Sequence, residues 1–331
     1  MSQFDDSGYI TRLSKAEFGC VDRGGAGMAV SPEHYADFLE RMGHSVRCSA
    51  GLWWFNIQNR VYTSFPFHRG IDAGEVDSAA VLGLDGLVLR YGCPEEQGTA
   101  SFRVMCQDPN YDFPNLRSRT RTQVRRGLEA CVVRQVDFAD LARDSIALHA
   151  DTLQRQGRSV PDDLERTWRR YYAEASRTTG AEAWAAFVDG RMAACLAAFV
   201  IEDVSNLLIV RSSLQHLESY PNNALIWQYL HTRLRQGDIR AVSYGYQSIQ
   251  AGLESLDQFK TGMGFEKVPT GQRVEFAGWL RPLINRVTLP VLQRLLSSGT
   301  DSEQRAKLLG LLQWYGNQPA RAALVRNSRA A

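Results

Sequence analysis

The chain is 331 residues long, and its 38 basic and 36 acidic side chains leave a formal net charge of +2. A hydrophobic content of 44% and a charged content of 22% are ordinary for a soluble globular protein, and the length allows two domains. The near balance of charge gives no reason to expect a nucleic acid or a strongly acidic protein as a partner.

The cysteines and the N-terminus bear on the compartment. The six cysteines are scattered without a CxxC pair, so we expect neither a metal site nor a disulfide framework. The N-terminal sequence MSQFDDSGYITR is acidic and polar, unlike a signal peptide, and no apolar run is long enough to span a bilayer. We therefore expect a cytoplasmic protein, with peripheral attachment to a membrane as the alternative.

The first third of the chain is predicted to be a helix followed by strands. Ser31, which precedes a proline, suits the N-cap of a helix that extends to about Met42. Residues 45–107 are dense in aromatic side chains, which favour strands. Within them the pair Asp85-Gly86, flanked by apolar residues, predicts a hairpin.

Residues 116–130 carry five arginines and one acidic residue, and Arg117, Arg121 and Arg125 share one face of the predicted helix. One interpretation is a helix that faces the phosphates of a nucleotide-like donor or of an RNA. The other is a solvated face whose arginines pair with acidic residues elsewhere in the protein.

From residue 132 to residue 276 the pattern predicts the element order β-α-α-β-β-β-α-β-α-β-β. A helix over residues 221–236 precedes a short strand, and Lys260 and Gly262 close the next helix. The segment KVPTGQRVEFAGWL is predicted to form the final pair of strands.

The last fifty residues are predicted to be helical. We expect these helices to pack on the body of the protein or on a second subunit. A membrane-surface helix is the alternative, because Arg281 and Arg286 flank apolar positions.

The element order resembles that of the GNAT (GCN5-related N-acetyltransferase) superfamily. Four segments are similar to its FemAB-type and CelD-type (BioF2-like) branch: LRSRTRTQVRRGLEACVVRQV, HADTLQRQGR, SSLQHLESYPNNALIWQYL and YGYQSIQAGLESLDQFKTGMGFEKV. The resemblance implies an α/β fold with a mixed GNAT-like sheet flanked by helices and two such modules in tandem. The implied domains are a degenerate N-terminal module (1–115), an acyltransferase module (116–280) and a helical extension (281–331).

Two features depart from the GNAT pattern. The pyrophosphate loop R/Q-x-x-G-x-G/A is absent before the helix that begins at Pro221, as it also is in FemAB-like proteins. Ser243-Tyr244-Gly245 stands where the family commonly has an aspartate. These departures motivate the hypothesis of a catalytically inactive binding protein with the same fold.

Acyl transfer to an amine needs a donor held by its phosphates, a polarised carbonyl and a route for the amine proton. Free N–H groups at the start of the Pro221 helix suit a phosphate. The residues predicted to bind the donor are Arg211, Asn222, Asn223, Ala224 and Lys260, and we expect Arg211 to face that helix.

The catalytic candidates follow from the same requirements. Lys260 matches the lysine of the FemAB-like ending and is suited to neutralise a donor phosphate or a developing oxyanion. Tyr244 or Tyr246 would protonate the leaving group, and His216 would serve as a base. The remaining candidates, Gln247 and Glu218, are predicted to bind the acceptor substrate.

The resemblance implies an N-acyltransferase that uses acetyl-CoA or another acyl-CoA, without a metal, on an amine of a small molecule such as a sugar, peptide or cell-envelope precursor. Aminoacyl-tRNA is the alternative donor. Coenzyme A is favoured because tRNA-dependent FemAB enzymes often carry a helical-arm insertion, and none is evident in this sequence.

Overall fold

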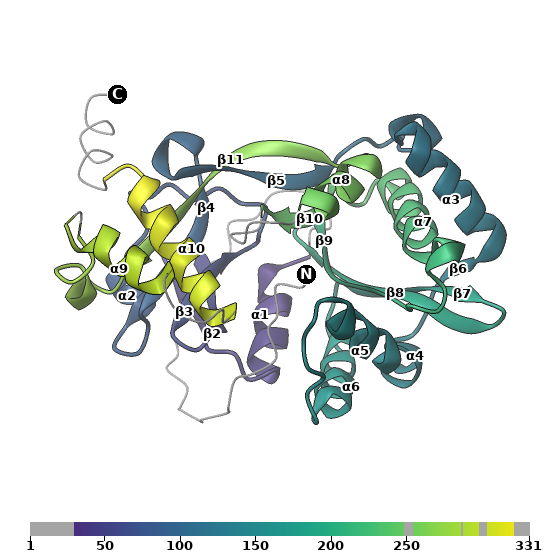
Figure 1. The fold of residues 1–331 in the computed structure, drawn as a ribbon, viewed down its shortest axis with the longest axis horizontal. Coiled ribbons are helices and arrows are strands. Elements are labelled where there is room, and N and C mark those ends of the chain that lie inside the picture. Colours follow the sequence, from purple (N-terminus) through teal and green to yellow (C-terminus); the bar gives the residue numbers. More distant parts are fainter. Residues whose placement is uncertain (1–29, 248–253, 286, 298–302, 321–331) are drawn as a thin grey trace.

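The computed structural model describes residues 30–247, 254–285, 287–297 and 303–320 and contains one large sheet with helices on both faces (Figure 1). The first half of the chain forms α1 (Pro32–Arg41), β1 (Val46–Ser49), β2 (Leu52–Gln58), β3 (Val61–Phe65), α2 (Ser78–Leu82), β4 (Val88–Cys93) and β5 (Thr99–Cys106). The second half forms α3 (Ser118–Ala130), β6 (Val132–Gln135), α4 (Phe138–Asp144), α5 (Ile146–Arg155), α6 (Leu164–Ala175), β7 (Ala181–Val188), β8 (Arg191–Ile201), β9 (Val204–Ser212), α7 (Pro221–Gln236), β10 (Ala241–Tyr246), α8 (Glu254–Gly262) and β11 (Glu266–Phe276). Helices α9 (Thr288–Ser297) and α10 (Glu303–Asn317) follow.

The sheet is built from two similar modules that exchange their last strands. Its order is β1-β2-β3-β4-β11-β5-β10-β9-β8-β7-β6. In each half an antiparallel meander (β1–β3 or β7–β9) leads through a helix (α2 or α7) to a parallel strand (β4 or β10). The final strand of each half then pairs with the parallel strand of the other, β5 with β10 and β11 with β4. The predicted tandem arrangement is therefore present as one continuous sheet.

This exchange corrects the strand pair predicted at the end of the second module. The segment KVPTGQRVEFAGWL supplies one long strand, β11, in which Pro269 stands opposite Phe102 and makes no turn. Its neighbours β4 and β5 both come from the first half. A second local strand is not needed, because the first half provides the partner.

The hairpin predicted at Asp85-Gly86 is wrong. The residues before this pair form α2, because the carboxylate of Asp77 accepts the backbone N–H groups of Ala79 and Ala80 and caps the helix. The Asp85-Gly86 pair instead lies in the connection from α2 to β4. Strand β4 runs parallel to β3, so the two do not form a hairpin.

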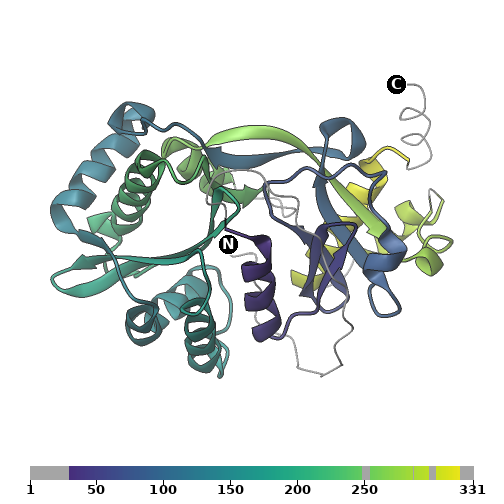
Figure 2. The ribbon, with the colours of Figure 1, turned by 180° about the vertical axis from the view of Figure 1, so that it is seen from behind.

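Helix α1 confirms the predicted capping and ties the two halves together. The hydroxyl of Ser31 accepts the N–H of Glu33, and the helix buries Tyr35, Phe38 and Leu39. It contacts β1 and β2 of its own half and α6 and β8 of the other. Figure 2 shows it between the two halves of the molecule.

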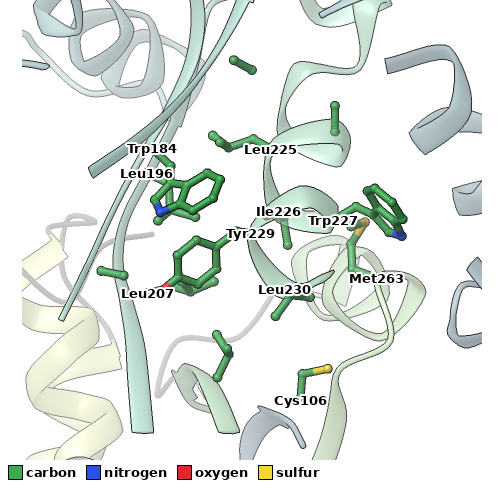
Figure 3. Close-up of a cluster of buried hydrophobic side chains, with 14 of the residues drawn as sticks. Cys106, Trp184, Leu196, Leu207, Leu225, Ile226, Trp227, Tyr229, Leu230 and Met263 are labelled. Carbon is green, nitrogen blue, oxygen red and sulfur yellow. The ribbon is translucent and has the colours of Figure 1, made fainter. Parts of the chain in front are cut away.

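Helix α7 lies in the core of the second half (Figure 3). Its buried residues Leu225, Ile226, Tyr229 and Leu230 share one apolar cluster with side chains of β7, β8 and β9. Helix α3 packs on α7 across Gly127, where a Cβ atom would lie 2.8 Å from the carbonyl oxygen of Tyr220. Because α7 is covered on two sides, its sequence is apolar around most of its circumference.

Helices α4, α5 and α6 cover the opposite face of the same strands. The predicted element order had two helices between its first and second strands, but the structure has three, because the chain breaks into α4 and α5 at Ser145, whose hydroxyl donates to the carbonyl of Leu141. The break turns α5 so that it runs beside β9.

The C-terminal helices confirm the predicted packing on the body of the protein. Leu311 and Leu312 of α10 are buried with Val274 and Phe276 of β11, and the ring of Tyr315 meets that of Phe276 at 4.9 Å between centroids. In the described part of the chain, no helix has the length and apolar content to cross a membrane. The domain boundaries remain predictions, and the sheet runs across the one at residue 115.

Candidate functional site

The ladder between the parallel strands β9 and β10 opens part way along. The two strands pair at Ala241, Val242 and Ser243, opposite Val204, Ser205 and Asn206. The rest of β9, up to Ser212, has no pairing with β10, because β10 shifts register at Gly245 (φ 92°) and continues along β5. Carboxyl ends of adjacent strands that separate in this way are where open α/β sheets bind ligands.

Lys260 and Tyr244 meet beside this opening. Lys260 is 6% exposed, and its ammonium nitrogen lies 4.5 Å from the centre of the Tyr244 ring. Phe265 holds the ring from the side, at 5.5 Å between centroids and an interplanar angle of 79°. Among the described residues, no hydrogen bond or ion pair satisfies this ammonium, so a cation–π contact is its main stabilising interaction.

Burial lowers the pKa of Lys260 to about 8, with the nearby charge of Asp257 opposing the shift and that of Lys267 adding to it. The lysine is therefore largely cationic at neutral pH and close enough to neutrality to exchange a proton. Lys267 and Asp257 form their own ion pair at 3.4 Å, which leaves Lys260 without a full counter-charge.

Burial also raises the pKa of Tyr244 to about 12, while the charge of Arg211 opposes this shift. The Tyr244 hydroxyl is consequently protonated throughout the physiological range and can act as a proton or hydrogen-bond donor.

The prediction that Arg211 faces α7 is wrong. Its side chain lies on the opposite face, where its Nε donates to Nδ1 of His149 at 3.2 Å and its guanidinium lies over the ring of Trp168. The other nitrogen of His149 is 2.8 Å from the Tyr172 hydroxyl, and the imidazole stacks on Trp168 at 3.6 Å. Burial and the charge of Arg211 hold the pKa of His149 well below its usual value, so the imidazole is neutral and accepts from Arg211.

Asn222 joins the end of β9 to the start of α7. Its amide nitrogen donates to the hydroxyl of Ser212 at 3.0 Å, and Arg155 of α5 donates to the Ser212 carbonyl at 3.2 Å. The side-chain oxygen of Asn222 is buried and has no hydrogen-bond partner among the described residues. An unsatisfied buried acceptor is costly and calls for a donor group from a ligand or a water molecule. Tyr220, two residues earlier, has φ 50° and ψ 42°, a backbone conformation that costs energy for a non-glycine residue.

The other two residues predicted at this helix start are turned inward. The amide of Asn223 is directed at Gln123 and at the sulfur of Met263. Ala224 is fully buried, and its N–H donates to the carbonyl of Tyr220. The packing of α3 on α7 accounts for both, and we leave Ala224 out of the proposed site because its N–H is already bonded.

Tyr246 and Gln247 lie on the other side of β10, at the seam between the halves. Tyr246 pairs with Arg103 of β5, and burial raises the pKa of its hydroxyl. That hydroxyl lies only 2.0 Å from where a Cβ would stand at Gly92 of β4. The side-chain oxygen of Gln247 accepts from Ser101 at 3.2 Å. These residues are thus separated from the Lys260–Tyr244 pair by the strand itself.

His216 and Glu218 remain in the connection before α7, where the sequence places them. His216 is half-buried and Glu218 is exposed, and neither side chain has a hydrogen bond or ion pair to the described residues. Their predicted roles, His216 as a base and Glu218 in binding the acceptor, therefore stay predictions.

The arginines of α3 do not pair with acidic residues as one interpretation expected. Arg121 donates to the carbonyls of Phe113 and Leu116, and Arg125 lies over the Phe113 ring. Within the described ranges, none of the five arginines forms an ion pair, and four of them are exposed. The face is therefore an uncompensated positive surface.

Three residues of the site were not singled out from the sequence: His149, Arg155 and Ser212. The first two lie in HADTLQRQGR, a segment noted only for its resemblance to the FemAB-like branch. The helical spacing of apolar residues predicts a helix here but does not indicate that the His149 imidazole is buried.

Solved structures with a similar course of chain include the crystal structure of FemX, with a TM-score of 0.54 and 12% identity over 76% of this chain and 92% of FemX. The C-terminal domain of a putative lysylphosphatidylglycerol synthetase from Agrobacterium fabrum has a TM-score of 0.49 and 13% identity over 73% of this chain and 87% of its own. A tandem GNAT protein from the clavulanic acid biosynthesis pathway has a TM-score of 0.40 and 11% identity over 69% and 78%.

No protein-family model matches the sequence, and no curated protein matches it either. The likeness to FemX, at 12% identity, is one of fold alone. The chain has a GNAT-like mixed α/β fold with two modules in tandem and a C-terminal helical extension.

Proposed function

We propose that this protein is a GNAT-type N-acyltransferase of the FemAB-like branch. It transfers an acyl group from acyl-CoA to an amine of a sugar, peptide or cell-envelope precursor in the cytoplasm. The observation that carries the proposal is the meeting of Lys260 and Tyr244 beside the opening between β9 and β10.

The polar groups at the opening fit an acyl-CoA donor. The side-chain oxygen of Asn222, which no described residue bonds, suits an amide N–H of the pantetheine arm. The N–H groups in the first turn of α7 and the cationic Lys260 suit phosphate or carbonyl oxygens. Arg211 lies on the opposite face of β9, held by His149, and is not part of this group.

In the transfer step, the acceptor amine attacks the acyl carbonyl carbon and a tetrahedral oxyanion forms. The Lys260 ammonium stabilises this negative charge in a site of low dielectric constant. When the carbon–sulfur bond breaks, the Tyr244 hydroxyl gives its proton to the thiolate. The proton lost by the amine passes to a base, for which His216 is the candidate, and returns to Tyr244 through solvent. Glu218 is a candidate for binding the acceptor, whereas Gln247 lies across β10 from Lys260 and Tyr244 and accepts from Ser101.

Isothermal titration with acetyl-CoA and longer acyl-CoAs tests the donor. We expect binding to wild type and at least tenfold weaker binding to Lys260→Ala and Asn222→Ala. The matched control is Lys267→Ala, because Lys267 is also on this side of the sheet but already has Asp257 as its partner. If no acyl-CoA binds, the proposed donor is wrong.

One observation favours aminoacyl-tRNA as a second candidate donor. The α3 surface carries Arg117, Arg119, Arg125 and Arg126 exposed and without acidic partners among the described residues. A tRNA would neutralise these charges and release counterions, so its binding would weaken steeply with salt. This candidate is excluded if measured tRNA binding is insensitive to salt. It is also excluded if the double variant Arg119→Gln/Arg126→Gln binds tRNA as tightly as wild type.

A protein that binds acyl-CoA yet acylates no amine in a panel of acceptors would instead be an inactive binding protein.

A further inference from the structure

The C-terminal extension carries a row of apolar side chains that are exposed in the described part of the protein. Among the described residues eleven large hydrophobic side chains are exposed, and six of these lie between positions 279 and 308. Five of the six recur at every fourth residue, with exposed fractions between 58% and 81%: Trp279, Leu283, Val287, Val291 and Leu295. We call these five residues the C-terminal apolar row.

Helix α9 is apolar on two sides. Leu289, Leu292 and Leu296 pack into the cluster formed with β11 and α10, whereas Val291 and Leu295 are exposed. A helix with an apolar circumference is normally covered all round. A concentrated exposed patch of this kind marks a surface that contacts a partner or a membrane.

The electric charge of the chain is segregated into the same region. Residues 276–331 contain eight basic and two acidic side chains, a net charge of +6, and no acidic residue occurs from 276 to 300. The preceding 275 residues hold the other 30 basic and 34 acidic side chains, a net charge of −4. The overall value of +2 therefore conceals a basic extension on an acidic body.

The exposed apolar side chains and the positive net charge together indicate what kind of partner binds this segment. A second copy bound through the same segment would bring two extensions of like net charge together and is disfavoured. An anionic bilayer accepts apolar side chains at the boundary between headgroups and acyl chains and attracts basic residues to its phosphates. Tryptophan is the residue typical of that boundary, as Trp279 would be here.

We propose that the C-terminal apolar row docks this protein on an anionic lipid bilayer, with Arg294 near the lipid phosphates. Figure 1 shows α9 at the left end of the molecule, away from α3 and α7, so docking leaves the opening between β9 and β10 accessible. The proposal does not depend on acyl transfer, and vesicle binding is measured without any acyl donor.

The test is flotation of the full-length protein with vesicles. We expect it to float with vesicles of phosphatidylglycerol and phosphatidylcholine in equal parts and not with phosphatidylcholine alone. Raising the salt to about 1 M, where the Debye length falls to about 3 Å, weakens the binding. The triple variant Val287→Ser, Val291→Ser, Leu295→Ser should bind at least tenfold more weakly, because binding scales with the apolar area inserted.

A matched triple variant controls for general hydrophobicity: Leu84→Ser, Leu214→Ser, Leu217→Ser removes three exposed leucines elsewhere and should float like wild type. All substituted side chains are exposed, and unchanged thermal unfolding of both variants checks that they fold. The proposal is overturned if wild type does not float, if the two triple variants float equally, or if the row variant instead abolishes a dimer seen by sedimentation.

Discussion

The ammonium group of Lys260 is stacked on the ring of Tyr244, with 4.5 Å between the nitrogen and the ring centre. The two residues come from α8 and β10, which the chain connects through residues outside the described ranges. The charge of Lys260 is therefore retained inside the protein by an aromatic face instead of a carboxylate. Such an arrangement keeps the cation available to a ligand. Burial of this charge also lowers the free energy of unfolding.

The first prediction concerns the stability that the protein loses by burying the Lys260 ammonium. The folded-state pKa of Lys260, about 8, is below the unfolded value of 10.5, so between pH 8 and pH 10.5 the unfolded state binds more protons and stability rises with pH. Below pH 8 the full penalty is present. Lys260→Met should therefore raise the unfolding free energy at pH 7 by about 1–3 kcal/mol, part of the gain being offset by the lost cation–π contact.

Urea unfolding at pH 7 and pH 10 checks this prediction, and the Met variant should lack the rise between them. Acyl transfer, once an acceptor is known, should fall by about 10²–10³-fold in the same variant. A variant that is both less stable and fully active would show that Lys260 has only a packing role.

The second prediction concerns the pH dependence of the rate. If the ammonium form of Lys260 stabilises the oxyanion, activity declines as pH rises through about 8. Lys260→Arg should move this decline to higher pH, because a guanidinium remains protonated, even if its maximal rate is lower. A rate that rises through pH 8 would identify the lysine as a base and contradict the electrostatic role.

The third prediction separates the two tyrosines. Tyr244→Phe keeps the ring under Lys260 and removes only the hydroxyl, so kcat should fall by about 10²-fold with little change in stability. Tyr246→Phe is the control on the same strand, and it should change kcat by less than about threefold because its hydroxyl lies at the seam beside Gly92. Equal losses in kcat for both variants would reject Tyr244 as the proton donor.

The fourth prediction concerns His149. Its folded-state pKa is well below the unfolded value of 6.5, so the neutral imidazole contributes stability that is fully present above pH 6.5 and lost as the pH falls. His149→Gln should flatten this acid loss and, by removing the acceptor of Arg211, cost about 1–3 kcal/mol at pH 7.5. Chemical unfolding at pH 5 and pH 7.5 measures both effects.

His34→Gln is the control for this experiment, since His34 is exposed on α1 and its replacement should leave the acid loss in place. If Arg211 positions the donor through His149, His149→Gln should also raise the Kd for acyl-CoA without changing kcat. An unchanged Kd would confine His149 to a structural role.

Local sequence signals predicted most elements of the second half, since β10, α8 and α7 appear where strand and helix patterns placed them. They could not predict the strand exchange. Alternating residues in Thr99–Cys106 show that a strand forms, but its neighbours β10 and β11 are more than 130 residues away in sequence and are chosen by the packing of the whole sheet.

The candidate site, like the fold, was predicted only in part. Tyr244 and Lys260 were predicted because they belong to one motif, and the structure brings them into contact. Arg211 was predicted with the wrong orientation, because a residue near the end of a strand can project to either face and one register shift decides which. His149 was overlooked because a polar residue in an amphipathic helix is normally expected to be solvated.

The exchange of β5 and β11 has a consequence for whether the protein can be divided into two independently folding fragments. A chain cut at residue 115 would leave β4 without β11 in one fragment and β10 without β5 in the other, each exposing an unpaired edge. The two fragments would have to be produced together and complement each other to regain a folded molecule. Each half therefore depends on the other for a strand that completes its part of the sheet.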